Sequence, residues 1–288
     1  MVILRDMQDP DPIPIIDFGG DGPPLHFAHA NAYPPQCYRQ LLEALRDHYH
    51  VWAMEQRPLW PAQAPQALDA WRVFAGDLVR ALAQHGGQPF IGAGHSLGAV
   101  VTMIAACERP DLFSALVLIE PVLLPPALLE MARTYPQQAR NIPLARRARN
   151  RRNRWPSRCR AFEHYRQKPV FERFSDEALW DYVNGGLVES PDGAVTLRFP
   201  REWEASIYGQ PPLDIWEIIP RIATPSLAIR GVHSDTVGDE SWQRWQEQQP
   251  TAHFVEIAES GHLAPLERPD TVGQITREFL QDVLDSAT

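Results

Sequence analysis

The sequence predicts an α/β fold in which a mostly parallel, doubly wound sheet carries helices on both faces. Short continuous apolar runs alternate with longer stretches of helical spacing from residue 13 onward, and this order is typical of repeated βα units. The 288 residues are 44% apolar and 22% charged, which suits a globular protein and argues against a disordered or repetitive chain. A chain of this length buries enough surface to fold without a metal or a disulfide.

Seven apolar runs have the length and continuity of buried parallel strands. They are residues 13–18, 25–28, 50–54, 89–93, 115–119, 226–230 and 253–258. Two stretches between them, 36–47 and 68–82, space their large apolar residues as one face of a helix does. These stretches are predicted to be the helices that connect parallel strands.

The strand-and-helix order fails between about residues 122 and 213. That stretch holds proline-punctuated helical pieces, a basic run, and a candidate turn at 190–193 followed by the alternating Val195, Leu197 and Phe199. The order resumes at Pro225. We therefore expect a core made of residues 1–121 and 214–288, with 122–213 inserted as a mainly helical cap over the sheet edge.

A serine stands at a strand-to-helix junction. Residues 94–98 read Gly-His-Ser-Leu-Gly, directly after the apolar run 89–93 and directly before a helical stretch. Glycines two residues to either side of Ser96 suit a sharp turn that leaves no room for neighbouring side chains. The context predicts an exposed nucleophilic hydroxyl, and the alternative is a glycine-rich turn that contains a structural serine.

A serine hydroxyl needs a base, and the base needs an acid to orient it. His262 follows the predicted strand 253–258, and Asp235 follows the predicted strand 226–230. Because the carboxyl ends of parallel strands lie on one edge of a sheet, we expect Ser96, Asp235 and His262 to meet there.

With these residues the chain resembles enzymes of the α/β-hydrolase fold, over nearly its full length. The order serine, acid, histidine is the one that this fold uses. Residues 230–235 match Arg-Gly-x-x-Ser-Asp and residues 260–269 match Ser-Gly-His-Leu-x-Pro-x-Glu-Arg-Pro, similar to the family's acid and histidine loops. The resemblance implies that Ser96 is the nucleophile, His262 the general base and Asp235 the residue that holds the imidazole.

Other residues compete for these roles. Glu120 ends the predicted strand 115–119, where some members of this fold carry their acid, so it is the reserve acid; its other interpretation is an anchoring carboxylate. His233 precedes the predicted acid and is expected to be a loop residue. His95 is expected to point away from the serine and pack against the next loop.

Acyl transfer also needs donors for the developing oxyanion. The backbone N–H of Leu97 is the first candidate. The second lies in the loop 29–34, His-Ala-Asn-Ala-Tyr-Pro, which resembles the family's His-Gly-x-x segment with Ala30 in the glycine position. The register favours the backbone of Asn31, with Ala30 as the alternative, and a simple βα turn capped by Asn31 remains open.

Charge is distributed unevenly along the chain. The net charge is −9, yet residues 140–173 hold twelve basic residues and two acids, and Lys168 is the only lysine among 27 basic residues. We expect the arginines of 146–154 to form a solvated helix that pairs with acids on the core. A substrate-directed arginine, which suits a carboxylate or phosphate, is the second interpretation, and nucleic-acid binding is the third.

Several classes of protein are disfavoured. The three cysteines are scattered without zinc spacing, so neither a disulfide framework nor a metal site is expected. No apolar stretch reaches about 18 residues, and the amino terminus lacks a secretory signal pattern. We expect a cytoplasmic protein without a membrane span, with a small-molecule substrate; a homodimer remains open.

The sequence thus predicts a cofactor-independent serine hydrolase of the carboxylesterase or thioesterase type. Aromatic residues of the insertion and loops, such as Trp155, Tyr182 and Trp203, favour a substrate with a hydrophobic part, although most are expected in the core. A carbon–carbon bond hydrolase or an acyltransferase would use the same residues. A dehalogenase or epoxide hydrolase would carry aspartate in place of Ser96, and the non-enzymatic alternative is a ligand-sensing receptor.

Overall fold

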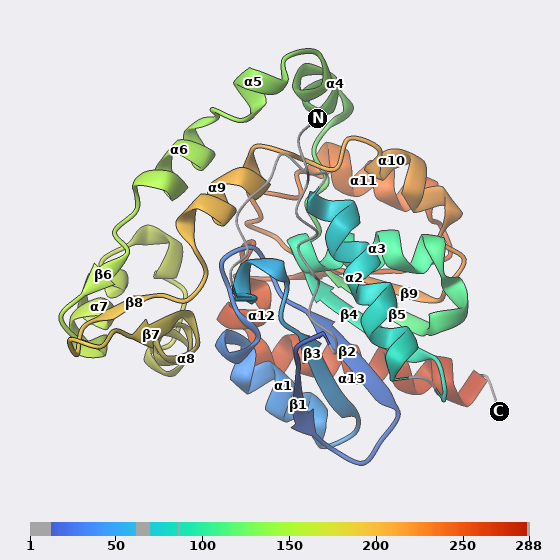
Figure 1. The fold of residues 1–288 in the computed structure, drawn as a ribbon. Coiled ribbons are helices and arrows are strands. Elements are labelled where there is room, and N and C mark those ends of the chain that lie inside the picture. The colour runs from blue at the N-terminus through green and yellow to red at the C-terminus, as the bar shows by residue number, and fades with distance from the viewer. Residues whose placement is uncertain (1–12, 62–69, 86, 287–288) are drawn as a thin grey trace, which may run out of the picture.

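A seven-stranded sheet forms the centre of the computed structural model, which describes residues 13–61, 70–85 and 87–286 (Figure 1). The strand order is β1-β3-β2-β4-β5-β9-β10, and all neighbours are parallel except β1, which runs antiparallel to β3 at one edge. The strands are β1 Ile15–Gly19, β2 Pro24–Ala28, β3 His50–Met54, β4 Phe90–His95, β5 Phe113–Ile119, β9 Ser226–Gly231 and β10 His253–Ile257. Each predicted apolar run overlaps one of these strands, so the mostly parallel α/β fold is confirmed.

Helices cover both faces of the sheet, and two separate apolar clusters fill the spaces beneath them. One face carries α2 Ala70–Gln84, α3 Leu97–Glu108, α10 Ile215–Ile218 and α11 Asp239–Gln248; the other carries α1 Arg39–Arg46, α12 Ala264–Glu267 and α13 Pro269–Ser286 (Figure 1). Successive residues of β5 alternate between the two clusters, since Leu116 packs in one and Val117 in the other. The predicted start of α2, at Leu68, lies outside the described residues.

Chain direction across the sheet reverses beside β2. The chain passes from β2 outward to β3, and then returns to the other side of β2 to form β4 and β5. The loops that leave β2 and β4 therefore diverge, and such a switch point is where ligands bind in open α/β sheets. Both loops carry residues that the sequence singles out, Asn31 after β2 and Ser96 after β4.

The chain between β5 and β9 adds no strand to this sheet, although β5 and β9 are neighbours within it. It forms helices and a three-stranded antiparallel sheet that extend to one side of the core (Figure 1). These elements are α4 Pro126–Thr134, α5 Pro136–Ala139, α6 Pro143–Asn150, β6 Arg154–Trp155, α7 Arg158–Arg166, α8 Asp176–Gly186, β7 Leu187–Glu189, β8 Val195–Leu197 and α9 Arg201–Tyr208. The predicted turn at 190–193 joins β7 to β8.

Short 3₁₀ helices complete the secondary structure. They are Pro35–Tyr38, Arg57–Leu59, Pro110–Leu112, Pro169–Phe171 and Ile219–Arg221. The described part of the chain contains no helix with the length and apolarity that crossing a bilayer requires. All three cysteines are free.

Candidate active site

Ser96 occupies a strained turn between β4 and α3. Its φ of 55° lies in the left-handed region that residues other than glycine rarely adopt. The flanking glycines are required by space, because a Cβ at Gly98 would overlap the carbonyl oxygen of Ala28, and one at Gly94 would lie 2.6 Å from the Gly98 carbonyl group. The close approach of α3 to β2 therefore depends on these two glycines and holds the serine at the sheet edge.

His262 reaches Ser96 from the loop that precedes α12. Its Nε2 lies 3.0 Å from Ser96 Oγ, across 166 residues of sequence. Ser96 is 6% exposed and the His262 side chain is 21% exposed, so the pair is largely shielded but not sealed. The structure thus brings together the serine and the histidine that the sequence singles out.

Glu120, and not Asp235, is the acid that meets the histidine. His262 Nδ1 lies 3.1 Å from Glu120 Oε2, and the Glu120 side chain is fully buried. The carboxylate also accepts the Gly231 backbone N–H at 2.6 Å and the Ser234 hydroxyl at 2.5 Å. Because a carboxylate only accepts, Nδ1 must carry the proton, which leaves Nε2 to accept the Ser96 hydroxyl.

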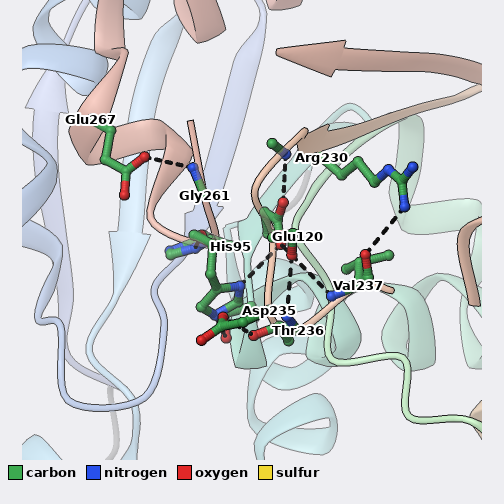
Figure 2. A network of polar contacts seen from close by, with 12 residues as sticks. His95, Glu120, Arg230, Asp235, Thr236, Val237, Gly261 and Glu267 are labelled. Carbon is green, nitrogen blue, oxygen red and sulfur yellow. Dashed lines mark hydrogen bonds and ion pairs between the residues drawn. The ribbon is translucent and has the colours of Figure 1, made fainter. Parts of the chain in front are cut away.

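The prediction that Asp235 holds the imidazole is wrong for this structure. Asp235 lies beyond the end of β9 on an exposed loop, and its side chain accepts a hydrogen bond from the Thr236 hydroxyl at 3.3 Å (Figure 2). Glu120 follows β5 directly, and its backbone N–H is bonded to Ile229 of β9 at 2.8 Å. Glu120 therefore enters the site beneath the loop that carries Asp235.

Only one of the two backbone groups considered for the second oxyanion donor is free. The Ala30 N–H donates to the Tyr38 hydroxyl at 3.2 Å, whereas the N–H groups of Asn31 and Leu97 have no acceptor among the described residues. The loop takes its positive φ at Ala32, 65°, and not at Ala30. Alanine in the glycine position is thus compatible with the loop, and Asn31 with Leu97 remains the candidate donor pair.

The loop after β2 is supported by a neutral histidine. Burial lowers the pKa of His29 to about 4. Its Nδ1 donates to the Ala30 carbonyl at 2.9 Å, and its Nε2 accepts the backbone N–H of Gln56 at 3.2 Å. The Gln56 side chain returns a hydrogen bond to the His29 carbonyl at 2.8 Å, so the loop is tied to the end of β3.

The loop that carries His262 is held by a second buried carboxylate. Glu267 Oε2 accepts the Gly261 backbone N–H at 2.7 Å (Figure 2). Burial raises the pKa of the Glu267 carboxyl. The sequence placed Glu267 in the histidine-loop motif without a role, and the structure shows that it fixes the backbone one residue before the histidine.

The remaining histidine predictions hold. His233 is exposed on the loop after β9. His95 packs against the loop that carries His262, and its Nε2 lies 2.8 Å from the His262 carbonyl oxygen. The residue that sequence reasoning missed is Tyr38, whose hydroxyl lies 2.8 Å from His95 Nδ1.

Within the run 146–154, Arg151 and Arg154 pair with acids of the segment between β5 and β9, so the expectation that the run pairs with acids on the core is wrong. Arg151 bonds Glu204 at 2.7 Å and the Tyr182 hydroxyl at 2.9 Å, and Arg154 pairs with Asp192. Contacts between insertion and core are made by other arginines, among them Arg39 with Asp181 at 2.7 Å.

Glu204 connects the insertion to the candidate oxyanion loop. Its backbone carbonyl accepts the side-chain N–H of Asn31 at 3.1 Å, while its carboxylate holds Arg151. The position of helix α9 is therefore linked to the loop that follows β2. Among the described residues, no group of three or more histidines, cysteines and carboxylates is placed to hold a metal ion.

Comparison with known proteins agrees with this fold. The model of the alpha/beta hydrolase family matches residues 27–275, which is most of the chain. The chain belongs to the alpha/beta hydrolase family. This assignment includes the strand ends that carry Ser96, Glu120 and His262.

Individual members of the alpha/beta hydrolase family are only distantly similar in sequence. An uncharacterized hydrolase, YugF, of Bacillus subtilis (strain 168) is 22% identical over 245 residues, which is 85% of each chain. The crystal structure of E-2-(acetamidomethylene)succinate hydrolase superposes with a TM-score of 0.79 at 18% identity, covering 93% of this chain and 94% of that one. A thioesterase domain from the curacin biosynthetic pathway gives 0.75 at 16% identity, covering 92% and 94%. These two structures establish the shared fold.

Proposed function

We propose that this protein is a serine hydrolase that cleaves an ester or thioester through a covalent acyl-enzyme. The observation that carries the proposal is the continuous hydrogen-bonded chain from Ser96 Oγ through the His262 ring to Glu120. A hydroxyl, an imidazole and a buried carboxylate in this order are the parts that nucleophilic acyl transfer needs.

The first half of the reaction forms the acyl-enzyme. Ser96 Oγ attacks the carbonyl carbon while His262 Nε2 takes the hydroxyl proton, and Glu120 stabilises the imidazolium that results. The N–H groups of Leu97 and Asn31 bind the oxyanion, each contributing about 3 kcal/mol to transition-state stabilisation. His262 then returns the proton to the leaving alcohol or thiol as the carbon–oxygen or carbon–sulfur bond breaks.

The second half releases the acid. His262 takes a proton from water, the hydroxide attacks the acyl carbon, and the Ser96 oxygen leaves as it regains that proton. No redox change occurs in either half, so the residues at hand suffice without a cofactor. The expected hydrophobic part of the substrate remains a proposal from the sequence, because Tyr182 and Trp203 are only 3% and 2% exposed and pack in the apolar clusters.

Fluorophosphonate labelling tests the nucleophile without knowledge of the substrate. Intact mass followed by peptide mapping should show one adduct, on Ser96, and Ser96→Ala should abolish it. Ser241→Ala is the matched control, because Ser241 is an equally buried serine on α11 and should leave labelling unchanged. Absence of an adduct on folded protein, or an adduct on Ser96→Ala, would overturn the proposal.

Turnover then defines the reaction. The panel consists of p-nitrophenyl esters of varied chain length together with acyl-CoA thioesters. Hydrolysis of at least one class, lost in Ser96→Ala, is the expected result. Labelling of Ser96 without hydrolysis of either class would retain the nucleophile and reject the ester or thioester assignment.

A further inference from the structure

A second series of hydrogen bonds passes through His95, the residue before Ser96. It begins at the His262 carbonyl oxygen, 2.8 Å from His95 Nε2. It continues from His95 Nδ1 to the Tyr38 hydroxyl at 2.8 Å, and ends at the Ala30 backbone N–H, 3.2 Å from that hydroxyl. The chain therefore connects the histidine loop to the candidate oxyanion loop.

The groups at the two ends determine which atom carries the hydrogen in each of these hydrogen bonds. A carbonyl oxygen only accepts, so His95 Nε2 carries hydrogen and donates to His262. Burial lowers the pKa of His95 well below its ordinary value, so the ring is neutral and Nδ1 is an acceptor. Tyr38 must then donate its hydroxyl hydrogen to Nδ1, and its oxygen is left to accept the Ala30 N–H.

No competing solvent reaches these groups. His95 is 0% exposed, Tyr38 is 1% exposed and Ala30 is 3% exposed. A buried polar group that loses its partner is costly, so the chain has one satisfied arrangement and resists displacement of either loop. The residues come from the loop after β2, the 3₁₀ helix Pro35–Tyr38, the end of β4 and the loop after β10.

We infer that His95 and Tyr38 are positioning residues. They hold the second oxyanion donor, the backbone N–H of Asn31, at a fixed position relative to His262. The inference rests on the proposed function. Tyr38 fixes the N–H of Ala30, and Asn31 is the next residue along the same loop. His95 fixes the carbonyl of His262 itself, so one rigid element sets the distance between the base and the oxyanion donor.

Three substitutions separate the links of this chain. Tyr38→Phe removes the hydroxyl and leaves the ring, whose centroid lies 4.7 Å from that of Phe27. His95→Gln can keep a donor toward the His262 carbonyl and loses the acceptor for Tyr38. His95→Asn does the reverse, because its amide oxygen can stand where Nδ1 stands.

The rate of Ser96 labelling by a fluorophosphonate is the first readout, on protein shown to be folded by circular dichroism. Tyr38→Phe and His95→Gln should each slow labelling about ten- to a hundredfold, since displacement of a catalytic group by about 1 Å has that effect. With an ester substrate both should lower kcat and leave KM within about twofold, because neither residue binds substrate.

A double-mutant cycle distinguishes positioning from independent packing. Tyr38→Phe and His95→Gln both break the hydrogen bond between these two side chains, and Tyr38→Phe also removes the acceptor of the Ala30 N–H. The double variant should therefore be no more than about threefold slower than Tyr38→Phe alone. His95→Asn combined with Tyr38→Phe breaks all three links and should be slower than either single variant. Tyr49→Phe is the control, since it removes the hydroxyl of another buried tyrosine, just before β3, and it should leave labelling unchanged.

The outcomes separate this inference from the proposed function. If the parent protein is not labelled at Ser96, the proposed function fails. If the parent is labelled but Tyr38→Phe and His95→Gln label at the parental rate, or if their effects multiply in the double variant, the positioning role fails while the nucleophile stands.

Discussion

The ends of β5 and β9 each deliver an acid to the same edge of the sheet, and they differ in burial and in partners. Glu120, at the end of β5, is fully buried and accepts hydrogen bonds from Gly231, Ser234 and His262. Asp235, four residues beyond β9, is exposed, and among the described residues its side chain accepts a hydrogen bond only from the Thr236 hydroxyl. The two strands are hydrogen-bonded neighbours.

The difference shows that the burial of a carboxylate decides which one contacts the histidine. The order of the sequence motifs along the chain does not decide it. The loop after β9 contributes to the site through Gly231 and Ser234, which donate to Glu120, while its own acid faces solvent. A carboxylate at a buried position keeps its full electrostatic effect on an imidazolium, whereas an exposed one is screened. The comparison predicts that substitutions at the ends of β5 and β9 will differ in the size of their effects on activity and stability.

Glu120→Gln should have the largest effect. The amide keeps the size of the side chain but cannot stabilise the imidazolium, and it can present a donor where His262 Nδ1–H needs an acceptor. We expect kcat to fall about 10³- to 10⁴-fold, as for the neutral variant of a triad acid. The rate of hydrolysis of the best ester or thioester measures this fall in kcat. A loss below tenfold would show that Glu120 is not the acid that orients His262.

Gly231→Ala should destabilise the fold at the point where the two strand ends meet. A methyl group there would overlap the carbonyl oxygen of Ser260. We expect the free energy of unfolding in urea to fall by about 1–3 kcal/mol. Gly238→Ala on the same loop is the control, because nothing lies within 4 Å of the position that its methyl group would occupy, and it should change stability by less than about 0.5 kcal/mol.

Ser234→Ala tests whether the loop after β9 acts through Glu120. Its hydroxyl donates to Glu120 at 2.5 Å and accepts the backbone N–H of Val237 at 2.9 Å. Loss of a hydrogen bond to a charged group should lower kcat about tenfold. Thr236→Val removes a hydroxyl whose hydrogen bond, within the described part of the chain, is to Asp235, and it should have no effect. Equal losses in both variants would count against the proposed path through Glu120.

Asp235→Asn should have the smallest effect. Because this side chain is exposed and has no hydrogen bond or ion pair with His262 among the described residues, we expect kcat and KM to stay within about twofold of the parent. The same assay used for Glu120→Gln measures it. A loss of orders of magnitude here would restore Asp235 as the orienting acid.

Sequence reasoning located the strands and the serine because these depend on local rules. Apolar runs bounded by polar residues mark the strands, and Gly94 and Gly98 mark a turn that only a crowded strand–helix junction requires. His262 was found because its loop motif follows the last predicted strand. These features are set by residues close together in the chain.

Two features could not be predicted from the sequence, namely which acid contacts His262 and which acids pair with the arginines. Both depend on contacts between residues far apart in the chain. Glu120 and Asp235 both follow strands, and which one lies beneath the other is set by how the loop 231–237 folds over β5. The position of Glu120 directly after the apolar run 115–119 was the available signal. Likewise, Arg151 meets Glu204 only because α6 and α9 pack together inside the insertion.

The most direct test of the central claim compares fluorophosphonate labelling of Ser96 in three proteins, namely the parent, Glu120→Gln and Asp235→Asn. It needs no knowledge of the substrate and reports the reactivity that His262 and its acid confer. We predict that Asp235→Asn labels at the parental rate and that Glu120→Gln labels at least about a hundredfold more slowly, as expected for loss of a triad acid. Slow labelling of Asp235→Asn with parental labelling of Glu120→Gln would contradict the assignment of Glu120.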